Sequence, residues 1–379
     1  MSKLEELIKE FCPNGVEYVK IGSVVNYEQP SKYLVKKADY KEEYSTPVLT
    51  AGQTFILGYT NEMNGIYNAS KDSPVIIFDD FTGAFKWVDF PFKVKSSAIK
   101  FLKANEKRAM LRYIFHVMGN INLTSTEHKR LWIGIYSELQ IPLPALPVQR
   151  EIVRVLDSFT LYSAELTAEL TARRKQYEFY RDKLLTFSQN DFEWTILEKI
   201  AVYTNGKGHE NNVNEKGKYI LINSKFVSTK GEVIKFVDEQ FSPIYQNEFA
   251  MVLSDLPNGR ALAKCFFVLE DDRYTVNQRI CKISNINEKI LPKFLFYYMD
   301  RNKYFLAKDN GVDQTNLSKD YVLQMPIPVL PLAFQKRIVY VLDNFDAICS
   351  DLGIGLPAEI EKRQKQYEYY RDKLLSFQN

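Results

Sequence analysis

The chain has 379 residues, of which 45% are hydrophobic and 26% charged, so it is long enough for two or three domains with cores of their own. Lys and Arg number 50 against 47 Asp and Glu, and the net charge of +3 permits nucleic-acid binding without implying it. The four cysteines form no CxxC pair, which excludes a common zinc pattern and indicates a reducing compartment. No apolar run has the length of a membrane span and the start MSKLEELIKEF is unlike a signal peptide, so we expect a cytoplasmic protein.

Residues 1–145 form the first predicted globular segment, of mixed α and β structure. Short β-rich runs such as PVIIFD and FKWVDFPFKV alternate with turns such as TAGQ and FTGA, and the aromatic run YIFHVM at 113–118 is typical of a helix. Polar and basic side chains beside the turns are candidates for DNA contact, because Arg and Lys pair with guanine, Asn and Gln pair with adenine, and any basic residue neutralises phosphate. These candidates are Thr50, Gln53, Lys86, Lys93 and Lys95, with Gly52 in the same turn.

Residues 146–189 are predicted to form one long helix. Between Ile152 and Phe187 the apolar and aromatic residues recur at alternating spacings of four and three, which is the 3.5-residue repeat of a coiled-coil seam. Prolines at positions 142, 144 and 147 mark the end of the globular segment and the start of this helix. We therefore expect a spacer of roughly 60 Å after the first domain.

Residues 190–330 form the second predicted globular segment, with a pattern like that of the first. Its β-rich runs are KYILINSKFV, FAMVLS and ALAKCFFVLE, and its aromatic helix is FLFYYM at 294–299. The candidates for DNA contact are Asn223, Lys225, Asn258, Arg260, Asn277, Gln278 and Arg279. Polar residues beside turns are also common as solvated surface or turn formers, and this alternative stays open for both sets.

Residues 331–379 repeat the long helix. RRKQYEFYRDKLLTF at 173–187 returns as RQKQYEYYRDKLLSF at 363–377 with twelve of fifteen positions identical, and IPLPALPVQREIVRVLDSF at 141–159 returns as IPVLPLAFQKRIVYVLDNF at 327–345. The two offsets, 190 and 186 residues, differ by four. The extra residues fall near Gly353, Gly355 and Pro357, so we expect the second helix to be broken there.

The repeats indicate that the whole chain is a duplication of one globular segment followed by one helix. The predicted fold class is α+β: two globular mixed α/β domains separated by two long antiparallel helices that form a coiled coil, with an internal pseudo-two-fold repeat. Helices that pack only on their own domains are the alternative. A chain with such an approximate two-fold axis has the symmetry that a dimer normally presents to a split DNA site.

The sequence lacks the motifs of a catalytic site that we searched for. There is no GxxxxGK[ST] for nucleotide phosphates and no Asn-Pro-Pro-aromatic motif of amino-methyltransferases, and NGKGHE at 205–210 fits a plain loop better than a phosphate cradle. The pairs Asp79–Asp80 and Asp271–Asp272 could bind magnesium, although neighbouring carboxylates in turns are usually helix caps or hydrated. The pattern favours a protein that reads DNA and performs no chemistry itself.

The order of domain, proline-bounded helix, second domain and second helix resembles the DNA-specificity subunit of a type I restriction-modification enzyme over essentially the whole chain. Two motifs carry the resemblance: Gln-x-x-Ile at each helix start and KQYE(F/Y)YRDKLL at each helix end. The matching positions are Gln149, Ile152, Tyr177, Tyr180, Arg181 and Leu184, and again Gln335, Ile338, Tyr367, Tyr370, Arg371 and Leu374. Many members carry an acidic residue before the glutamine, where this chain has Val148 and Phe334, a difference that concerns only the helix start.

The resemblance implies that residues 1–145 and 190–330 are target-recognition domains that each read half of a split site in double-stranded DNA. The helices 146–189 and 331–379 would set the gap and dock two methylation subunits. The implied partner-binding residues are Gln149, Tyr177, Tyr180, Arg181, Gln335, Tyr367, Tyr370 and Arg371. The chain would then be no enzyme and hold no cofactor, since the methylation subunits bind S-adenosylmethionine and methylate adenine, and added restriction subunits cut unmodified DNA.

Two other functions stay open. The chain could be a stand-alone, two-headed DNA-binding regulator, or a coiled-coil scaffold whose globular ends bind proteins. A regulator would bind DNA specifically without a methylation subunit, whereas a scaffold would bind no DNA in either case.

Overall fold

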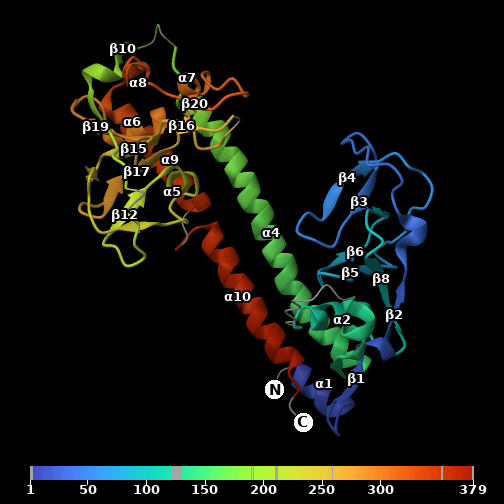
Figure 1. The fold of residues 1–379 in the computed structure, drawn as a ribbon. Coiled ribbons are helices and arrows are strands. Elements are labelled where there is room, and N and C mark those ends of the chain that lie inside the picture. Colours follow the sequence, from blue (N-terminus) through green and yellow to red (C-terminus); the bar gives the residue numbers. More distant parts are fainter. Residues whose placement is uncertain are drawn as a thin grey trace. The chain divides into compact units, whose positions relative to one another are not determined.

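The computed structural model of the protein describes residues 3–121, 130–188, 190, 192–209, 212–257, 259–350 and 353–377. Contacts between residues divide the chain into two compact units: unit 1 consists of Met1–Ala168 and Ala358–Asn379, and unit 2 of Glu169–Pro357. Each unit contains one globular domain of mixed helices and strands together with pieces of the long helices (Figure 1).

Unit 1 builds its domain from three sheets and short helices. The sheets have the strand orders β2-β8-β5-β6, β4-β3-β7 and β1-β9. The elements are α1 (Lys3–Phe11), β1 (Glu17–Lys20), β2 (Val25–Glu28), β3 (Thr46–Leu49), β4 (Ile56–Thr60), β5 (Val75–Asp79), β6 (Phe85–Val88), β7 (Lys93–Val94), β8 (Ile99–Ala104), α2 (Leu111–Met118), α3 (Leu131–Gly134) and β9 (Gln140–Leu143). The long helix α4 (Leu146–Leu184) begins here, and α10 (Leu356–Leu375) ends here.

Unit 2 repeats this arrangement with extra strands. Its sheets have the orders β11-β19-β15-β17, β13-β12-β18-β14, β10-β21 and β16-β20. The elements are β10 (Glu193–Ile196), β11 (Ala201–Asn205), β12 (Tyr219–Ile222), α5 (Ser224–Ser228), β13 (Phe236–Val237), β14 (Pro243–Ile244), β15 (Phe249–Val252), β16 (Ser254–Asp255), β17 (Cys265–Phe267), β18 (Tyr274–Val276), β19 (Ile280–Asn285), α6 (Pro292–Met299), α7 (Lys303–Leu306), β20 (Thr315–Asn316), α8 (Lys319–Leu323), β21 (Pro326–Val329) and α9 (Leu332–Ser350).

The two domains share one topology, which confirms the predicted mixed α and β duplication. In both, one sheet is antiparallel throughout, and the next combines an antiparallel neighbour with a parallel pair, β3 with β7 in unit 1 and β12 with β18 in unit 2. One local prediction was wrong, because the last four residues of the β-rich run KYILINSKFV belong to helix α5. Pro142, Pro326 and Pro328 lie inside strands β9 and β21. Proline is tolerated there because each of these strands has only one partner.

The aromatic helices α2 and α6 join each domain to the long helix that follows it. Tyr113 and Val117 of α2 are buried in one core with Ile152 of α4, and Phe294 of α6 is buried with Ile338 of α9. Apolar residues three and four positions apart form one face of such a helix, so a single buried stripe meets the start of the long helix. The seam residues predicted from the heptad pattern are therefore fully buried where each long helix begins.

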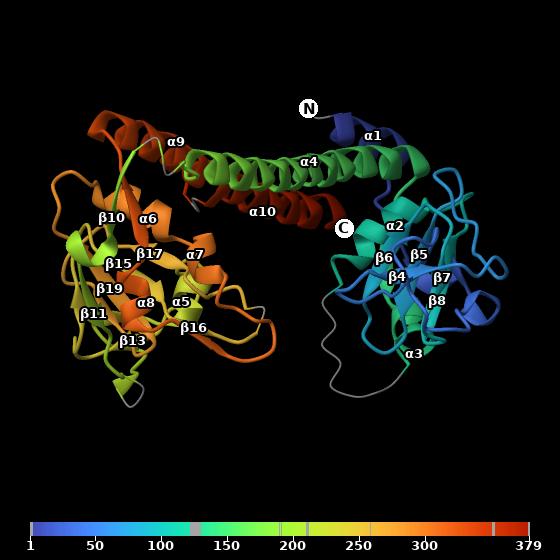
Figure 2. The same cartoon turned by 90° about the horizontal axis from the view of Figure 1, so that it is seen from above.

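The long helices pair antiparallel inside each unit, which confirms the coiled coil. In unit 1 the rings of Phe159 and Tyr370 stack with centroids 5.2 Å apart, and the Arg363 guanidinium lies 5.1 Å from the Tyr162 ring. Residue numbers rise along α4 as they fall along α10, so the two helices run antiparallel. In unit 2 the Tyr180 ring stacks on Phe345 with centroids 5.9 Å apart. Figure 2 shows α4 beside α10 in unit 1 and α9 against the domain of unit 2.

Each unit therefore combines helical pieces from both copies of the repeat. The domain of unit 1 and the first half of α4 pack against α10, whereas the domain of unit 2 and α9 pack against the second half of α4. The second copy is divided in two, because α9 ends at Ser350 and α10 begins at Leu356. In the described part of the chain no helix is both long and apolar enough to cross a membrane.

A buried glutamine fixes the start of each long helix. Gln149 is fully buried; its Oε1 accepts the Met110 N–H at 2.9 Å, and its Nε2 donates to the carbonyls of Arg108 at 2.9 Å and Pro144 at 2.7 Å. Gln335 repeats these bonds at 2.7–2.8 Å with the backbone of Leu291, Lys289 and Leu330. Each amide thus joins the start of the aromatic helix to the start of the long helix.

We expect Gln149→Ala to lower the free energy of unfolding of unit 1 by about 2 to 4 kcal/mol, because three buried backbone groups lose their partner at once. Urea denaturation followed by circular dichroism measures the change. Gln364→Ala on α10 is the matched control, since Gln364 is exposed and bonds only to Glu368 one turn away. Equal free energies of unfolding of the two variants would contradict the stabilising role of the Gln149 hydrogen bonds.

Candidate functional site

Several of the predicted DNA-contact residues lie at one place in each domain, the end of a parallel strand pair. In unit 1 the Lys95 N–H donates to the Leu49 carbonyl at 3.4 Å, so Thr50 and Lys95 leave β3 and β7 side by side. In unit 2 the Asn277 N–H donates to the Ile222 carbonyl at 3.0 Å. Asn223 and Asn277 therefore occupy the positions of Thr50 and Lys95, and we call this place the strand-end edge of each domain.

The edge of unit 1 presents a tight turn. The Thr50 hydroxyl donates to the Thr54 carbonyl at 2.7 Å and accepts the Gly52 N–H at 3.2 Å, which leaves Gln53 exposed at the tip. Lys95 is exposed, and its ammonium lies 5.6 Å from the centre of the Tyr40 ring. The Gln53 amide is thus exposed on an ordered turn, and the Lys95 cation is exposed on the segment that follows β7.

Lys93 and Lys86 do not join this edge. The Lys93 side chain is only 1% exposed, and its ammonium is held by the Glu62 carboxylate at 3.2 Å and by the carbonyls of Asn64 and Gly65 at 2.7 and 3.1 Å. A buried cation with three oxygen partners stabilises the fold and has no surface to offer DNA, so its geometry gives the predicted contact no support. Lys86 lies on β6, the edge strand of the other sheet.

In unit 2 the two predicted asparagines hold the edge together. Asn223 caps α5 by accepting the Phe226 N–H at 2.9 Å, and Asn277 is 8% exposed with its Oδ1 accepting the His209 N–H at 3.2 Å. The side-chain oxygen of each asparagine therefore accepts from a backbone N–H group. Lys225, Gln278 and Arg279 are the exposed neighbours of these asparagines.

A second loop lies against this edge and adds a cation that the sequence analysis did not select. The Gly206 N–H donates to Ile280 at 2.8 Å and the Lys207 N–H to Val276 at 3.1 Å. A Cβ at position 206 would lie 2.1 Å from the Asn277 carbonyl oxygen, so only glycine permits this approach. The GKG fragment was interpreted as a plain loop, but in the structure it places the exposed Lys207 beside the turn of Gln278 and Arg279.

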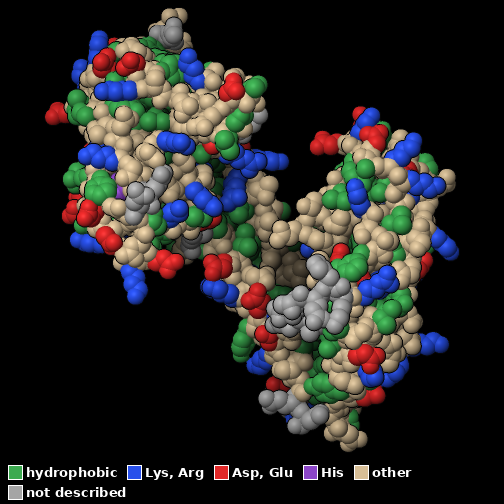
Figure 3. Space-filling model, in the orientation of Figure 1, with side chains coloured by type: hydrophobic (Ala, Val, Ile, Leu, Met, Phe, Trp, Pro, Cys, Tyr) green, Lys and Arg blue, Asp and Glu red, His purple; other side chains and the backbone are tan. Residues whose placement is uncertain are grey.

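Arg279 and Arg260 are the exposed arginines of this region. Arg279 adopts a φ of +67°, unusual for a residue with a side chain, and neither guanidinium has a hydrogen bond or ion pair in the described part of the chain. Arg260 lies on the loop after β16, where a Cβ at Gly259 would be 2.0 Å from the Asp255 carboxylate. Asn258 lies outside the described residues. Figure 3 shows Lys and Arg side chains gathered over the loops of unit 2 beside α5 and the end of α4.

His209 is the buried support of the Lys207 loop. Its Nδ1 lies 2.7 Å from the Lys207 carbonyl and must donate, while Nε2 accepts the Phe241 N–H at 3.2 Å and lies 3.0 Å from the Thr275 hydroxyl. These bonds require the neutral ring. Burial lowers the pKa of the imidazole below its ordinary value of 6.5, although the bond to Lys207 opposes the shift.

The aspartate pairs that were considered for magnesium hold backbone instead. Asp79 accepts the N–H groups of Phe81 and Thr82 at 2.9 and 3.0 Å, and Asp80 pairs with Lys100 at 3.1 Å in the interior. Asp271 accepts the Gln246 N–H at 2.7 Å. Among the described residues no group of three or more His, Cys, Asp or Glu is arranged to hold a metal ion.

Most of the predicted partner-binding residues make contacts within their own unit. Gln149 and Gln335 are fully buried, so they leave no atom for a partner in this conformation. The Tyr367 hydroxyl lies 3.2 Å from His116, and Arg371 donates to the Gly119 carbonyl at 2.9 Å. Tyr177 packs on the core of unit 2, and Arg181 pairs with a carboxylate of the same unit at 3.5 Å.

Tyr180 and Tyr370 are each 39% exposed, and their neighbours in the sequence are more exposed still. Phe179 and Tyr369 occupy the same position of the repeat, directly before Tyr180 and Tyr370, and are 64% and 61% exposed. The sequence analysis missed them because they fall off the heptad seam, although an aromatic residue at an off-seam position is itself a signal of a contact surface.

Comparison with known proteins adds independent observations. A family model described as "Type I restriction modification DNA specificity domain" matches residues 13–173 and again residues 196–362. The chain is 40% identical to the type I restriction enzyme EcoR124I/EcoR124II specificity subunit of Escherichia coli, over 100% of this chain and 98% of that protein. It is 27% identical to a putative type I restriction enzyme specificity subunit of Haemophilus influenzae, over 99% and 98% of the two chains.

Solved structures support the same fold. The S subunit of a type I restriction-modification system from M. genitalium superposes with a TM-score of 0.58 at 16% identity, covering 97% of this chain and 98% of that one. A chain from a study of the assembly and conformational transition of the type I R-M system gives a TM-score of 0.59 at 14% identity, with coverages of 96% and 98%. At these identities the likeness concerns the fold alone.

We expect stability of the His209 loop to fall as the pH drops. The folded-state pKa of His209 is lowered, so the unfolded chain binds the proton first as the pH falls. The contribution of neutral His209 to the free energy of unfolding is therefore fully present above pH 6.5 and is lost as the pH falls below that value. Thermal unfolding measured between pH 8 and pH 5 on the parent and on His209→Gln tests this, since glutamine keeps a donor and an acceptor without titrating in that range. Identical pH profiles of the two proteins would contradict the role given to His209.

Proposed function

Because this chain belongs to the family of type I restriction-modification DNA specificity domains, we propose that it is the DNA-recognition subunit of such an enzyme. Each of its two domains reads one half of a split site in double-stranded DNA. The observation that carries the proposal is the repetition of the strand-end edge: Thr50 with Lys95 in unit 1 and Asn223 with Asn277 in unit 2 occupy equivalent positions at the end of a parallel strand pair.

The residues around each edge fit base and phosphate contact. In unit 2 the arginine side chains of Arg260 and Arg279 suit guanine, the Gln278 amide suits adenine, and Lys207 suits a phosphate. In unit 1, Gln53 on an ordered turn and Lys95 directly after β7 have the same chemistries. The side-chain oxygens of Thr50, Asn223 and Asn277 hold the local backbone, and so these residues help to position the neighbouring contacts.

Two equivalent surfaces on the duplicated helices suit two copies of one partner. Phe179 and Tyr369 expose an aromatic ring at the same repeat position, and an exposed ring at an interface contributes large apolar area with little loss of side-chain freedom. We assign them to two methylation subunits, which would supply S-adenosylmethionine and the methyl transfer to adenine. Restriction subunits would join the same complex in the cytoplasm, and this chain would contribute recognition without catalysis.

Helix α4 is proposed to set the gap between the half-sites. It is continuous from Leu146 to Leu184, begins in unit 1 and ends in unit 2, and so is an unbroken link of about 58 Å. The second copy of the repeat is interrupted between α9 and α10 and is less suited to act as a ruler.

The proposed function is tested by the chain reconstituted with methylation subunits on libraries of split sites. Arg279→Ala should weaken the free energy of DNA binding by about 1 to 3 kcal/mol at a site with the preferred guanine, and should relax the base preference at one position of one half-site. Lys207→Ala should instead weaken all sequences alike and reduce the salt dependence by about one counterion. Arg279 and Lys207 are neighbouring cations, so each variant is a matched control for the other. In a separate test, incorporation of methyl groups by the chain without methylation subunits would overturn its non-catalytic role.

Lengthening α4 should lengthen the gap. Four residues that repeat 167–170 are inserted between Ala168 and Glu169, at the boundary of the two units, so that both sets of packing contacts are kept. Four flexible residues are also added near Gly353 to keep the second connection unstrained. The insertion adds about 6 Å and about 40° beyond one turn, so the preferred gap should grow by one or two base pairs of about 3.4 Å, with unchanged bases in both half-sites.

The loop addition alone is the control and should leave the gap unchanged. Two inserted residues in α4 would rotate one unit by about 200° and should abolish specific binding. Methylation of the original site with its original gap by the four-residue variant would show that α4 is not the ruler.

A further inference from the structure

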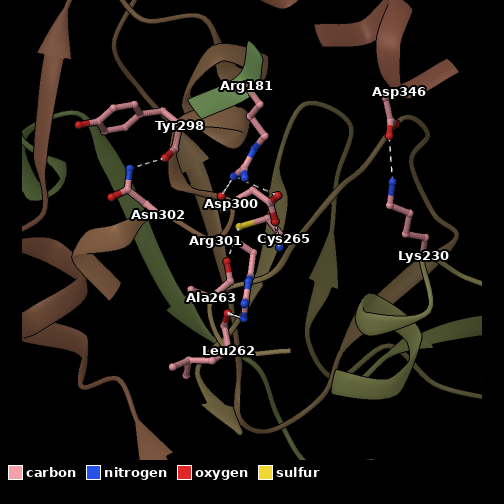
Figure 4. Close-up of polar contacts among 10 residues, drawn as sticks. All are labelled: Arg181, Lys230, Leu262, Ala263, Cys265, Tyr298, Asp300, Arg301, Asn302 and Asp346. Atoms are coloured by element: carbon pink, nitrogen blue, oxygen red, sulfur yellow. Dashed lines mark hydrogen bonds and ion pairs between the residues drawn. The ribbon is translucent and has the colours of Figure 1, made fainter. Parts of the chain in front are cut away.

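One corner of unit 2 connects the end of α4 to the loop that lies between β16 and β17. Residues Asp300 and Arg301 follow α6 and lie between Arg181 of α4 and the loop 255–264 (Figure 4). Figure 4 shows Arg181 pointing onto Asp300 from one side and Arg301 pointing toward Leu262 on the other.

The first half of this connection is formed by Asp300. The Arg181 guanidinium donates to the backbone carbonyl of Asp300 and lies 3.5 Å from its carboxylate. The same carboxylate accepts the Cys265 N–H at 2.8 Å. Asp300 therefore joins the helix end to the strand β17 that closes the loop.

The second half is formed by Arg301. Its N–H donates to the Ala263 carbonyl at 2.9 Å, and its guanidinium donates to the carbonyls of Leu262 at 3.3 Å and Gly259 at 3.4 Å. Arg301 adopts a φ of +54°, a conformation that costs free energy for any residue with a Cβ. One arginine in a strained conformation thus binds three carbonyls of one loop.

The opposite side of the loop is held by Asp255. Its carboxylate accepts the N–H groups of Ala261 at 2.6 Å and Leu262 at 3.2 Å. Between these two anchors Arg260 is exposed, and its guanidinium has no partner in the described part of the chain. Loop geometry is therefore fixed on both sides of a cation that is free to contact a ligand.

The described residues of unit 1 do not contain this connection. Gly119 and Asn120 occupy the positions of Asp300 and Arg301 after the aromatic helix, and Arg371, the counterpart of Arg181, donates to the Gly119 carbonyl at 2.9 Å and to its neighbour Asp372. The carboxylate and the second guanidinium are additions of unit 2. A role limited to the shared scaffold would not require them.

We propose that Arg301, supported by Asp300 and Arg181, is a positioning residue that fixes the Arg260 loop and so sets the base preference of the half-site read by unit 2. This inference rests on the proposed function, because it requires that the Arg260 loop contacts DNA. It makes that half-site, and not the other, dependent on a contact at the end of α4.

The corner borders an open groove of about 770 Å³ lined among others by Arg181, Asp300 and Arg301. The Arg181 Nε and the Trp194 Nε1 on its wall have no partner in the part of the chain that the structure describes. Because water can enter this groove, truncation of Arg301 should leave solvated carbonyls and not a dry cavity, and the variants should fold.

The test compares Arg301→Ala, Arg301→Gly and Arg260→Ala in the full chain with methylation subunits, on sites randomised in either half. Alanine removes the guanidinium and keeps the strained φ, whereas glycine also relieves the strain. We expect both Arg301 variants to reduce base discrimination in the unit 2 half-site by about tenfold or more at the positions that Arg260→Ala relaxes. In an Arg260→Ala background Arg301→Ala should have no further effect, because the loop then carries nothing to position.

Lys303→Ala is the matched control and should leave the preference of the unit 2 half-site unchanged, because this exposed cation lies two residues after Arg301 and pairs with Asp182 of α4 at 3.6 Å. Wild-type discrimination in both Arg301 variants, with unchanged thermal unfolding, would overturn the positioning role and leave the proposed function intact. Unchanged binding and preference in Arg260→Ala would also overturn it, because the loop would then be no DNA contact. Loss of specific binding by the unmodified complex would instead overturn the proposed function itself.

Discussion

Stacking between the two copies of one helix is the contact on which both units depend. Phe159 packs on Tyr370 in unit 1, and the equivalent Phe345 packs on Tyr180 in unit 2, so each copy supplies the partner that the other lacks. The start of each long helix is buried against the aromatic helix of its own domain, whereas the stretches around Phe159 and Phe345 are covered by the other copy of the repeat. The duplication is therefore a structural requirement: one copy of the helix leaves an apolar seam exposed, and two copies cover each other.

The same arrangement explains which predictions from sequence succeeded. Periodicity and repetition are properties of many residues at once, so the heptad seam and the duplicated fold could be recognised without any side-chain detail. The fate of a single polar residue depends on its neighbours in space. Lys93 and Asn277 look like exposed turn residues in the sequence, yet one is enclosed by oxygen atoms and the other holds a loop. Gln149 matches a family motif because it fastens two helix starts inside the unit.

The residues that sequence reasoning missed were overlooked for a common reason. Lys207 was set aside because its glycines did not fit a phosphate cradle, whereas those glycines permit a close approach to the Asn277 carbonyl. Phe179 and Tyr369 were not selected because they lie off the heptad seam, although their rings are 64% and 61% exposed. Both the GKG fragment and the off-seam aromatic residues are short sequence features. Whether such a feature lies on a contact surface is decided by the folded structure.

A duplicated scaffold that carries two different reading surfaces meets a physical difficulty. The groups shared by both units, such as the buried glutamines and the stacked rings, fix the positions of the helices. They do not determine the conformation of the loops, which differ in length and sequence between the units. Each reading loop must then be held by residues of its own domain. In unit 2 this is visible where Asp300 and Arg301 replace Gly119 and Asn120: the corner keeps the shared bond from the helix arginine to a backbone carbonyl and adds side chains that reach the Arg260 loop. The difference between the units therefore lies where the common framework ends and the individual loops begin.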